Sequence, residues 1–258
     1  MRTDVSQIHG VTKDEIVSGL RGLGIREGDG VLVHSSLTSF GYVIGGADTV
    51  IDALLDATGP EGTILVPTLT GRREDGPASP PVFDVRNTPS WTGRIPTEVM
   101  KRPEARRSLH PTHSVSGIGS IVGALIEGHE HSLTPCGVES PYYRLAQRGG
   151  FILLIGVGQG SNTTIHTAEE LAEVPYHMQR EPADTIIIDY DGNRRIEPLY
   201  LHDWGTPRCF ERIDKELLDL DIMRIGKVGA STLRLIKSLP MIEFLVEKLR
   251  KEPRYLCR

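Results

Sequence analysis

Short apolar runs alternate with helical patterns in the first part of the chain. Residues 12–23 place Ile16, Leu20 and Leu23 on one stripe, and Thr12 and Glu15 can form a capping box ahead of them. The elements predicted here are helices over 12–23 and 45–60, and buried strands over 31–34 and 63–66. Because a strand, a helix and a second strand follow one another, the pattern predicts a layered α/β fold.

The later elements are less regular and surround one long segment without periodicity. The patterns predict helices over 95–101, 119–127, 164–173, 210–220 and 241–251, and strands over 151–156, 185–190, 194–201 and 227–236. Asp191-Gly192-Asn193 separates two of these strands and predicts a hairpin. Residues 70–90 are rich in Pro, Gly, Arg and Asp, which favours a functional lid or wall, with disorder as the alternative. No repeat or linker interrupts the chain, so we expect one domain over residues 1–258.

The composition narrows the class of protein and its partners. Apolar residues make up 38% of 258 residues, and the formal net charge is −5. Since no basic tract stands out, we expect no nucleic-acid partner, and the mild acidity would suit a cationic small molecule. The three cysteines are far apart, and neither a signal peptide nor an apolar stretch long enough for a membrane span is recognisable. The chain is therefore expected to be cytoplasmic and not to bind a membrane.

The segment after the predicted strand 151–156 carries the candidate catalytic base. Glycines at 156, 158 and 160 let the backbone turn sharply, and Asn162 or Thr163 can cap the following helix. His166 then lies in the first turn, with Glu169 and Glu170 three and four residues further on, where a carboxylate can orient an imidazole. The alternative is an ordinary capping or core histidine. Glycines after a strand are also typical of a dinucleotide-binding site. The G-x-G-x-x-G motif is incomplete here, however, because Ser161 replaces its third glycine.

A second histidine segment, Arg106 to Ser114, suggests a ligand-binding loop. Pro111 favours an extended conformation at His110. His110 and His113 would need further ligands to hold a metal, and none is obvious nearby, so the sequence predicts no metal site. Arg106 and Arg107 could meet phosphates, or they are a surface basic pair.

These segments together resemble the aminoglycoside 3-N-acetyltransferases, a family of antibiotic-resistance enzymes that use acetyl-CoA and are unrelated to the GNAT fold. The matching segments, in the order of the family, are 33–41 with Gly45-Gly46, 62–68, 87–89 with 93–96, 107–114, 137–145, 153–169 and 226–229. The resemblance covers roughly residues 12–250, and the joint order and spacing of the motifs carry it.

The resemblance implies a three-layer α/β/α fold with a mixed central sheet and a C-terminal hairpin and helix region. It also implies His166 as the catalytic base, with Glu169 as its carboxylate. The residues it implies for binding acetyl-CoA are Ser35, Ser36, Leu37, Phe40, Gly41, Pro67, Thr68, His110, Pro111, Thr112 and Ser114. Direct attack of the amine on the thioester in a ternary complex would need a base and oxyanion donors, for which Ser35, Ser36, Ser114 and Thr163 are candidates.

The acceptor is the least defined part of this interpretation. An aminoglycoside is a polycation and needs carboxylates, and the candidates are Asp75, Asp84, Glu98, Glu139, Glu170 and Asp203. The stretch 200–205 departs from the family pattern, which leaves a different small amine open as acceptor. A Ser–His hydrolase is a further alternative, although the sequence lacks the G-x-S-x-G elbow. A non-catalytic binder of coenzyme A or of a nucleotide is another.

Overall fold

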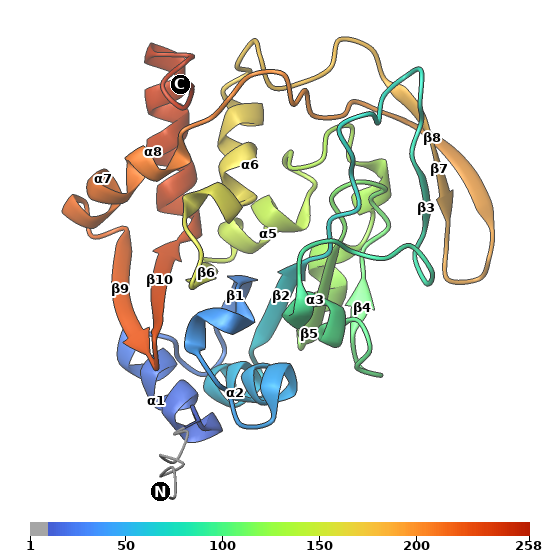
Figure 1. The fold of residues 1–258 in the computed structure, drawn as a ribbon. Helices are drawn as coiled ribbons and strands as arrows, with labels where there is room; N and C mark the ends of the chain where they lie inside the picture. Colours follow the sequence, from blue (N-terminus) through green and yellow to red (C-terminus); the bar gives the residue numbers. More distant parts are fainter. Residues whose placement is uncertain (1–9) are drawn as a thin grey trace, which may run out of the picture.

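A seven-stranded mixed sheet runs through the computed structural model, which describes residues 10–258 (Figure 1). Its strand order is β4-β5-β2-β1-β6-β10-β9. The central strand β1 (Gly30–Ser35) pairs in parallel with β2 (Thr63–Pro67) on one side and β6 (Phe151–Ile155) on the other. The carboxyl ends of these three strands therefore lie at one edge of the sheet.

Antiparallel strands extend the sheet on both sides. β5 (Val115–Gly119) pairs with β2 and then with the short β4 (Arg106–Arg107). On the other side β10 (Ser231–Lys237) pairs with β6 and with β9 (Met223–Val228). The predicted mixed sheet is thereby confirmed, although the pattern of residues 115–119 did not reveal β5.

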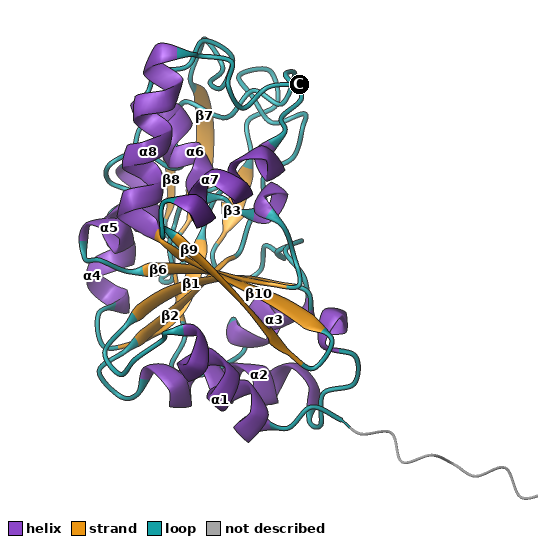
Figure 2. Ribbon diagram, turned by 90° about the vertical axis from the view of Figure 1, so that its left-hand side faces the viewer, coloured by secondary structure: helices purple, strands orange, loops and turns teal. Residues whose placement is uncertain are grey.

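Helices cover both faces of the sheet, which gives the expected three layers (Figure 2). One face carries α1 (Lys13–Leu23), α2 (Gly46–Thr58) and α3 (Arg94–Val99), and the other carries α4 (Val122–Ile126), α5 (Pro141–Gln147), α6 (Thr164–Leu171), α7 (Asp214–Asp219) and α8 (Ser238–Lys251). Successive side chains of β1 face opposite layers: Val31 and Val33 pack toward α1 and α2, and Leu32 packs toward α4 and α5. Each layer thus has its own apolar core.

The predicted capping box opens α1. Thr12 Oγ1 accepts a hydrogen bond from the Glu15 amide at 3.3 Å, and Glu15 Oε2 accepts one from the Thr12 amide at 2.8 Å. The reciprocal pair satisfies two backbone donors that a helix start leaves without partners. The buried residues Ile16, Leu20 and Leu23 then fix α1 against the sheet.

A second, three-stranded sheet has the order β3-β7-β8. The hairpin of β7 (Ala183–Ile188) and β8 (Arg194–Leu199) confirms the prediction from the Asp-Gly turn. β3 (Val82–Asp84) pairs in parallel with β7, so the segment 70–90 is not free of regular structure. Neither disorder nor lack of structure describes it, because a partner strand distant in sequence supplies its hydrogen bonds.

The single strand predicted over 227–236 is wrong in its boundaries. The structure has two strands, β9 and β10, joined by a turn in which Gly229 adopts a φ of 54°. A glycine tolerates this left-handed conformation, and the turn lets both halves of the apolar run join the main sheet. The remaining regular elements are the short 3-10 helices η1 (Leu37–Phe40), η2 (His129–His131), η3 (Gln159–Ser161) and η4 (Phe210–Ile213).

None of the helices within residues 10–258 combines the length and apolarity that crossing a bilayer requires. The expectation that the chain has no signal peptide rests on residues 1–10, of which residues 1–9 lie outside the described residues.

Candidate active site

A cavity of about 350 Å³ opens where the three parallel strands end. Ser35, Pro67 and Val157 contribute from the ends of β1, β2 and the turn after β6. The full lining is Val33, His34, Ser35, Pro67, Leu69, Trp91, Thr92, Gly93, Pro96, His113, Val157, Gly160, Ser161, Asn162, Thr163, His166 and Trp204. Sites of α/β proteins lie at the carboxyl ends of parallel strands, so this cleft is the candidate active site.

Residues 70–90 were predicted to form a wall of the site, but the residues that line the cleft flank this segment on either side. Leu69 and the three residues Trp91 to Gly93 line the cleft, whereas many of the residues between Thr70 and Ser90 border a different hollow. The segment therefore brings its two ends to the site while its middle joins the second sheet.

Gly156 lets the loop after β1 lie against the end of β6. Its φ is 64°, and a β-carbon placed there would lie 1.9 Å from Ser39 Oγ. The Ser36 amide donates to the Ile155 carbonyl oxygen at 2.9 Å, which holds the two segments together. Only a residue without a side chain permits this contact.

His166 reaches the cleft from the first turn of α6. The turn η3 precedes this helix. Thr163 occupies the N-cap position, but its side chain makes no capping hydrogen bond; Asn162 Oδ1 instead accepts one from the Thr164 amide at 3.2 Å. The His166 side chain is 13% exposed and lines the cleft. It is therefore neither packed inside the core nor turned away from the cavity.

Glu169 is hydrogen-bonded to the ring nitrogen Nδ1 of His166. Its fully buried carboxylate lies 2.7 Å from His166 Nδ1, and Arg208 Nε donates to its other oxygen at 3.3 Å. Burial alone would raise the pKa of Glu169. The hydrogen bond from His166 and the neighbouring side chains of His166, His177 and Arg208 outweigh burial and lower the pKa to about 2. The carboxylate is therefore ionised at neutral pH.

The ionised carboxylate fixes the tautomer of His166. An ionised Glu169 can only accept, so the shared hydrogen belongs to His166 Nδ1. In the neutral ring the lone pair is then on Nε2. A base with one ring nitrogen held by a buried carboxylate is the arrangement found in acyl-transfer enzymes.

The loop residues predicted to bind acetyl-CoA fall into two groups, of which the first follows β1. Ser35 lines the cleft, and its hydroxyl is buried without a hydrogen-bond partner among the described residues. Ser36 Oγ lies 3.2 Å from Thr38 Oγ1, and Leu37 and Gly41 lie on the same loop. Phe40 is only 2% exposed and packs in the core, so its side chain supports the loop from within.

The second group comprises Pro67, Thr68, His110, Pro111, Thr112 and Ser114, and only Pro67 lines the cleft. Ser114 Oγ donates to the Thr68 carbonyl oxygen at 2.7 Å, and the His110 ring lies 4.7 Å from the His129 ring. These buried side chains form the wall behind His113, which does line the cleft. Whether their backbone contacts the cofactor stays a prediction.

Arg107 is not a surface basic residue. It is 6% exposed, and its guanidinium donates to the Thr68 and Thr88 carbonyl oxygens at 3.0 and 2.7 Å. Burial lowers its pKa to about 10. The side chain is committed to holding the wall together and is not available for a phosphate.

The acidic acceptor candidates do not gather in the cleft. Asp75 and Asp84 bond to nearby backbone amides, Glu98 pairs with Arg94 and Lys101, and Glu139 is exposed before α5. Glu170 is buried against the Cys136 amide and His202, and burial raises its pKa to about 8. Asp203 is exposed and directly precedes Trp204, which lines the cleft, so it is the best placed of the six.

Several residues of the cleft were not predicted from the sequence. Both tryptophans of the chain, Trp91 and Trp204, line it, and tryptophans in otherwise polar loops are a signal that could have indicated them. His34 also lines it, and burial lowers its pKa to about 3, so this ring is neutral. Arg208 lies 42 positions beyond His166 (208 − 166), and no local pattern links the two.

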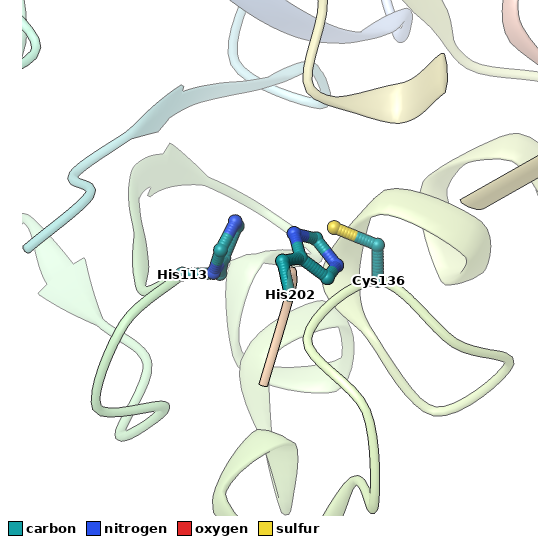
Figure 3. A group of neighbouring side chains, drawn as sticks. All are labelled: His113, Cys136 and His202. Carbon is teal, nitrogen blue, oxygen red and sulfur yellow. The ribbon is translucent and has the colours of Figure 1, made fainter. Parts of the chain in front are cut away.

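Two groups of side chains in the described part of the chain have the composition of a metal site. They are His113 with Cys136 and His202, and His166 with His177 and His202, and within each group the ligand atoms lie within 4.8 Å of one another. The sequence predicted no metal because it offered His113 no third ligand. Folding brings Cys136 and His202 beside it from distant segments (Figure 3).

The chain is similar to known proteins along most of its length. Residues 32–250 match the family model described as aminoglycoside 3-N-acetyltransferase. Aminoglycoside N(3)-acetyltransferase VII of Streptomyces paromomycinus is 31% identical over 94% of this chain and 94% of the relative. Aminoglycoside N(3)-acetyltransferase III of a Salmonella species is 33% identical over 93% of this chain and 92% of the relative.

Solved structures give the same result. AAC-IIIb in a binary complex with CoASH has a TM-score of 0.83 at 26% identity, covering 94% of this chain and 97% of that chain. A variant of aminoglycoside acetyltransferase AAC(3)-IVa in complex with a gentamicin has a TM-score of 0.82 at 29% identity, covering 96% of this chain and 92% of that chain. The chain therefore belongs to the aminoglycoside 3-N-acetyltransferase family of acyltransferases.

Proposed function

We propose that this enzyme transfers the acetyl group of acetyl-CoA to the 3-amino group of a deoxystreptamine aminoglycoside, by direct attack within a ternary complex. The observation that carries the proposal is the position of His166, which lies in the cleft and is hydrogen-bonded to the buried carboxylate of Glu169. The family, and the relatives solved with CoASH and with a gentamicin, supply the two substrates.

The first chemical step is removal of a proton from the amine. An ammonium group cannot attack a thioester, because its lone pair is bonded to hydrogen. The acceptor therefore first loses its ammonium proton to solvent. His166 Nε2 then accepts a second proton from the neutral amine as the nitrogen attacks the acetyl carbon, and Glu169 stabilises the imidazolium that forms. Glu169 itself stays ionised throughout, which its low pKa permits.

The second requirement is stabilisation of the tetrahedral oxyanion. Ser35 is the strongest candidate donor, since this residue lines the cleft and its buried hydroxyl has no partner among the described residues. Thr163 lines the cleft as well, whereas the Ser114 hydroxyl is already bonded to the Thr68 carbonyl. Collapse of the intermediate breaks the carbon–sulfur bond, and the departing thiolate of CoA takes the proton from the imidazolium.

The shape of the cleft fits an acetyl thioester. Val33, Leu69, Pro96 and Val157 give it apolar walls, and beside them lies Ser35, whose hydroxyl has no partner in the described part of the chain. Such a lining excludes water and strengthens hydrogen bonds to a developing oxyanion. We propose Asp203, at the edge of this lining, as a group that meets an ammonium of the acceptor.

We also propose that the chain works as a single domain. The final strands β9 and β10 complete the sheet that β1 and β2 begin, so the two ends of the sequence share one core.

A thiol-release assay with acetyl-CoA and a panel of deoxystreptamine antibiotics tests the proposal. We expect turnover with several of them, acetylation at N3 by NMR, and a loss of ~100-fold or more in His166→Ala because no general base replaces the ring. His131→Ala is the matched control, because that ring is 58% exposed and does not line the cleft. Release of thiol without any amine would favour the hydrolase, and an unchanged rate in His166→Ala would exclude this ring as the base.

A further inference from the structure

We propose that His113, Cys136 and His202 bind one zinc ion, or a transition-metal ion of similar ligand preference. All three side chains are buried, and one ligand atom of each lies within 4.8 Å of the other two. They come from three separate segments and point toward one another (Figure 3). Imidazole nitrogen and thiolate sulfur are the ligands that zinc prefers in proteins.

The spacing of the three ligand atoms is close to what zinc needs. Ligands bonded at about 2.0–2.3 Å around a tetrahedral ion lie roughly 3.3–3.8 Å from one another. Side-chain movements of about 1 Å would therefore close the set. Binding would release the proton of the Cys136 thiol to solvent, and water would take the fourth position.

The surroundings of His202 fix which nitrogen faces the ion. Its Nε2 lies 2.7 Å from Glu170 Oε1, and its Nδ1 is buried without a partner within residues 10–258. The same carboxylate oxygen accepts a hydrogen bond from the Cys136 amide at 2.9 Å. A carboxylate that orients the far nitrogen of a ligating histidine is a regular feature of metal sites. Here it would hold two of the three ligands.

His113 is oriented in a comparable way by a hydroxyl. Its Nδ1 lies 2.9 Å from Thr112 Oγ1, which leaves Nε2 as the available ligand atom. Each imidazole of the site thus has one nitrogen engaged by the protein and one free. An unpaired buried nitrogen such as His202 Nδ1 is costly, and an ion would supply its missing partner.

The second group of possible ligands is less suitable. It contains His166, whose Nδ1 is already bonded to Glu169 and whose Nε2 is needed as the catalytic base. It also lacks a thiolate and shares His202 with the first group, so one ion cannot satisfy both.

A bound ion would restrain two residues that line the cleft, His113 and Trp204. His113 lines the cleft, and its ring lies parallel to that of Trp204 at 6.3 Å between centroids. Trp204 follows His202 by two residues, so an ion on His202 would fix the loop that carries this tryptophan. We expect bound zinc to define the wall of the cleft and not to take part in acetyl transfer.

Metal analysis of the full chain tests the proposal. Protein stripped with a chelator and dialysed against zinc is expected to retain one zinc per chain by elemental analysis, with a higher melting temperature. Cobalt in its place is expected to give a thiolate-to-metal absorption band. Cys136→Ser should lose that band and lower zinc affinity by ~100-fold or more, and Glu170→Gln should lower it roughly 10–100-fold.

Cys209→Ser is the matched control, because that thiol is part-exposed and outside both groups. Circular dichroism of each variant separates loss of the ion from loss of the fold. No zinc retained by the folded wild-type chain would overturn the proposal. So would zinc binding that survives Cys136→Ser and disappears in His177→Ala, because the second group would then be the site.

Discussion

At the scale of single residues, the cleft contains polar groups of two kinds. His166 is fully specified, because its Nδ1 is bonded and only Nε2 can act. Ser35 is the opposite case, since its hydroxyl is buried beside the cleft with no partner among the described residues. A buried hydroxyl without a partner costs free energy in the unliganded protein. We expect it to gain a hydrogen bond when the substrate is bound.

Ser35→Ala is expected to lower kcat by roughly 10²–10³-fold while leaving the protein as stable as the wild type, or slightly more stable. The rate falls because the tetrahedral oxyanion loses a donor. Stability is preserved because the free enzyme loses no hydrogen bond of this hydroxyl. Steady-state kinetics and thermal unfolding measure the two effects.

Ser120→Ala is the comparison, because its hydroxyl is bonded to the Glu61 carbonyl oxygen away from the cleft. This variant should cost about 1 kcal/mol of unfolding free energy at most and leave kcat unchanged. An unchanged kcat in Ser35→Ala would move the oxyanion contact to Thr163 or to backbone amides.

At the scale of elements, the site depends on how closely the loop after β1 approaches the end of β6. Gly156 makes this approach possible through its positive φ and missing side chain. The Ser39 hydroxyl that occupies the space also lies 2.8 Å from Ser231 Oγ at the start of β10. One glycine thus joins three elements around the cleft.

Gly156→Ala is expected to lower the unfolding free energy by about 2–4 kcal/mol and to reduce activity. The left-handed conformation costs about 1–2 kcal/mol for alanine, and displacement of Ser39 adds a similar amount. Gly192→Ala has a φ of 82° with nothing within 4 Å of the added carbon, so it carries only the first cost. Denaturant unfolding compares the two variants, and equal losses would contradict the close-contact argument.

The sequence predicted most elements because their signals are local. The α1 capping box, the Asp-Gly hairpin and the His166–Glu169 spacing each lie within a few consecutive residues, and the structure has all three. No local sequence signal indicates whether the side chain of a loop residue points into the protein or into the cleft. Phe40 and Ser114 lie in matching motifs but point into the protein, and no period of two or 3.6 residues applies in a loop.

Contacts between distant segments were also beyond the reach of the sequence. Cys136 and His202 lie beside His113 only because separate loops meet behind the cleft, so the spacing of cysteines and histidines could not indicate the group. Similarly, β3 was hidden because its hydrogen bonds come from β7, about 100 positions later. Apolar periodicity reports burial, and it does not report which strand is the partner.

At the scale of the whole molecule, the base and its supports come from three separate segments in the second half of the chain. Arg208 and His177 approach Glu169 from outside α6, with Arg208 Nη2 3.1 Å from His177 Nδ1. The carboxylate is fully buried, so its ionised form is tolerated only while these partners are in place. The negative charge of Glu169 is therefore stabilised only in the folded state, where its partners surround it.

This dependence predicts a specific acid response. The pKa of Glu169 is lowered from 4.5 to about 2 in the folded protein, so its ionised form stabilises the fold above pH 4.5 by up to about 3 kcal/mol. That contribution is lost as the pH falls from 4.5 toward 2, because the folded state must then take up the proton. Glu169→Gln should thus be much less stable than the wild type at pH 7 and approach it near pH 2, in urea unfolding across the range. Glu181→Gln, an exposed position, should show no such convergence. If Glu169→Gln is less stable than the wild type by the same amount at every pH, the lost stability comes from packing. It would then not come from the carboxylate charge of Glu169 and its contacts with His166, His177 and Arg208.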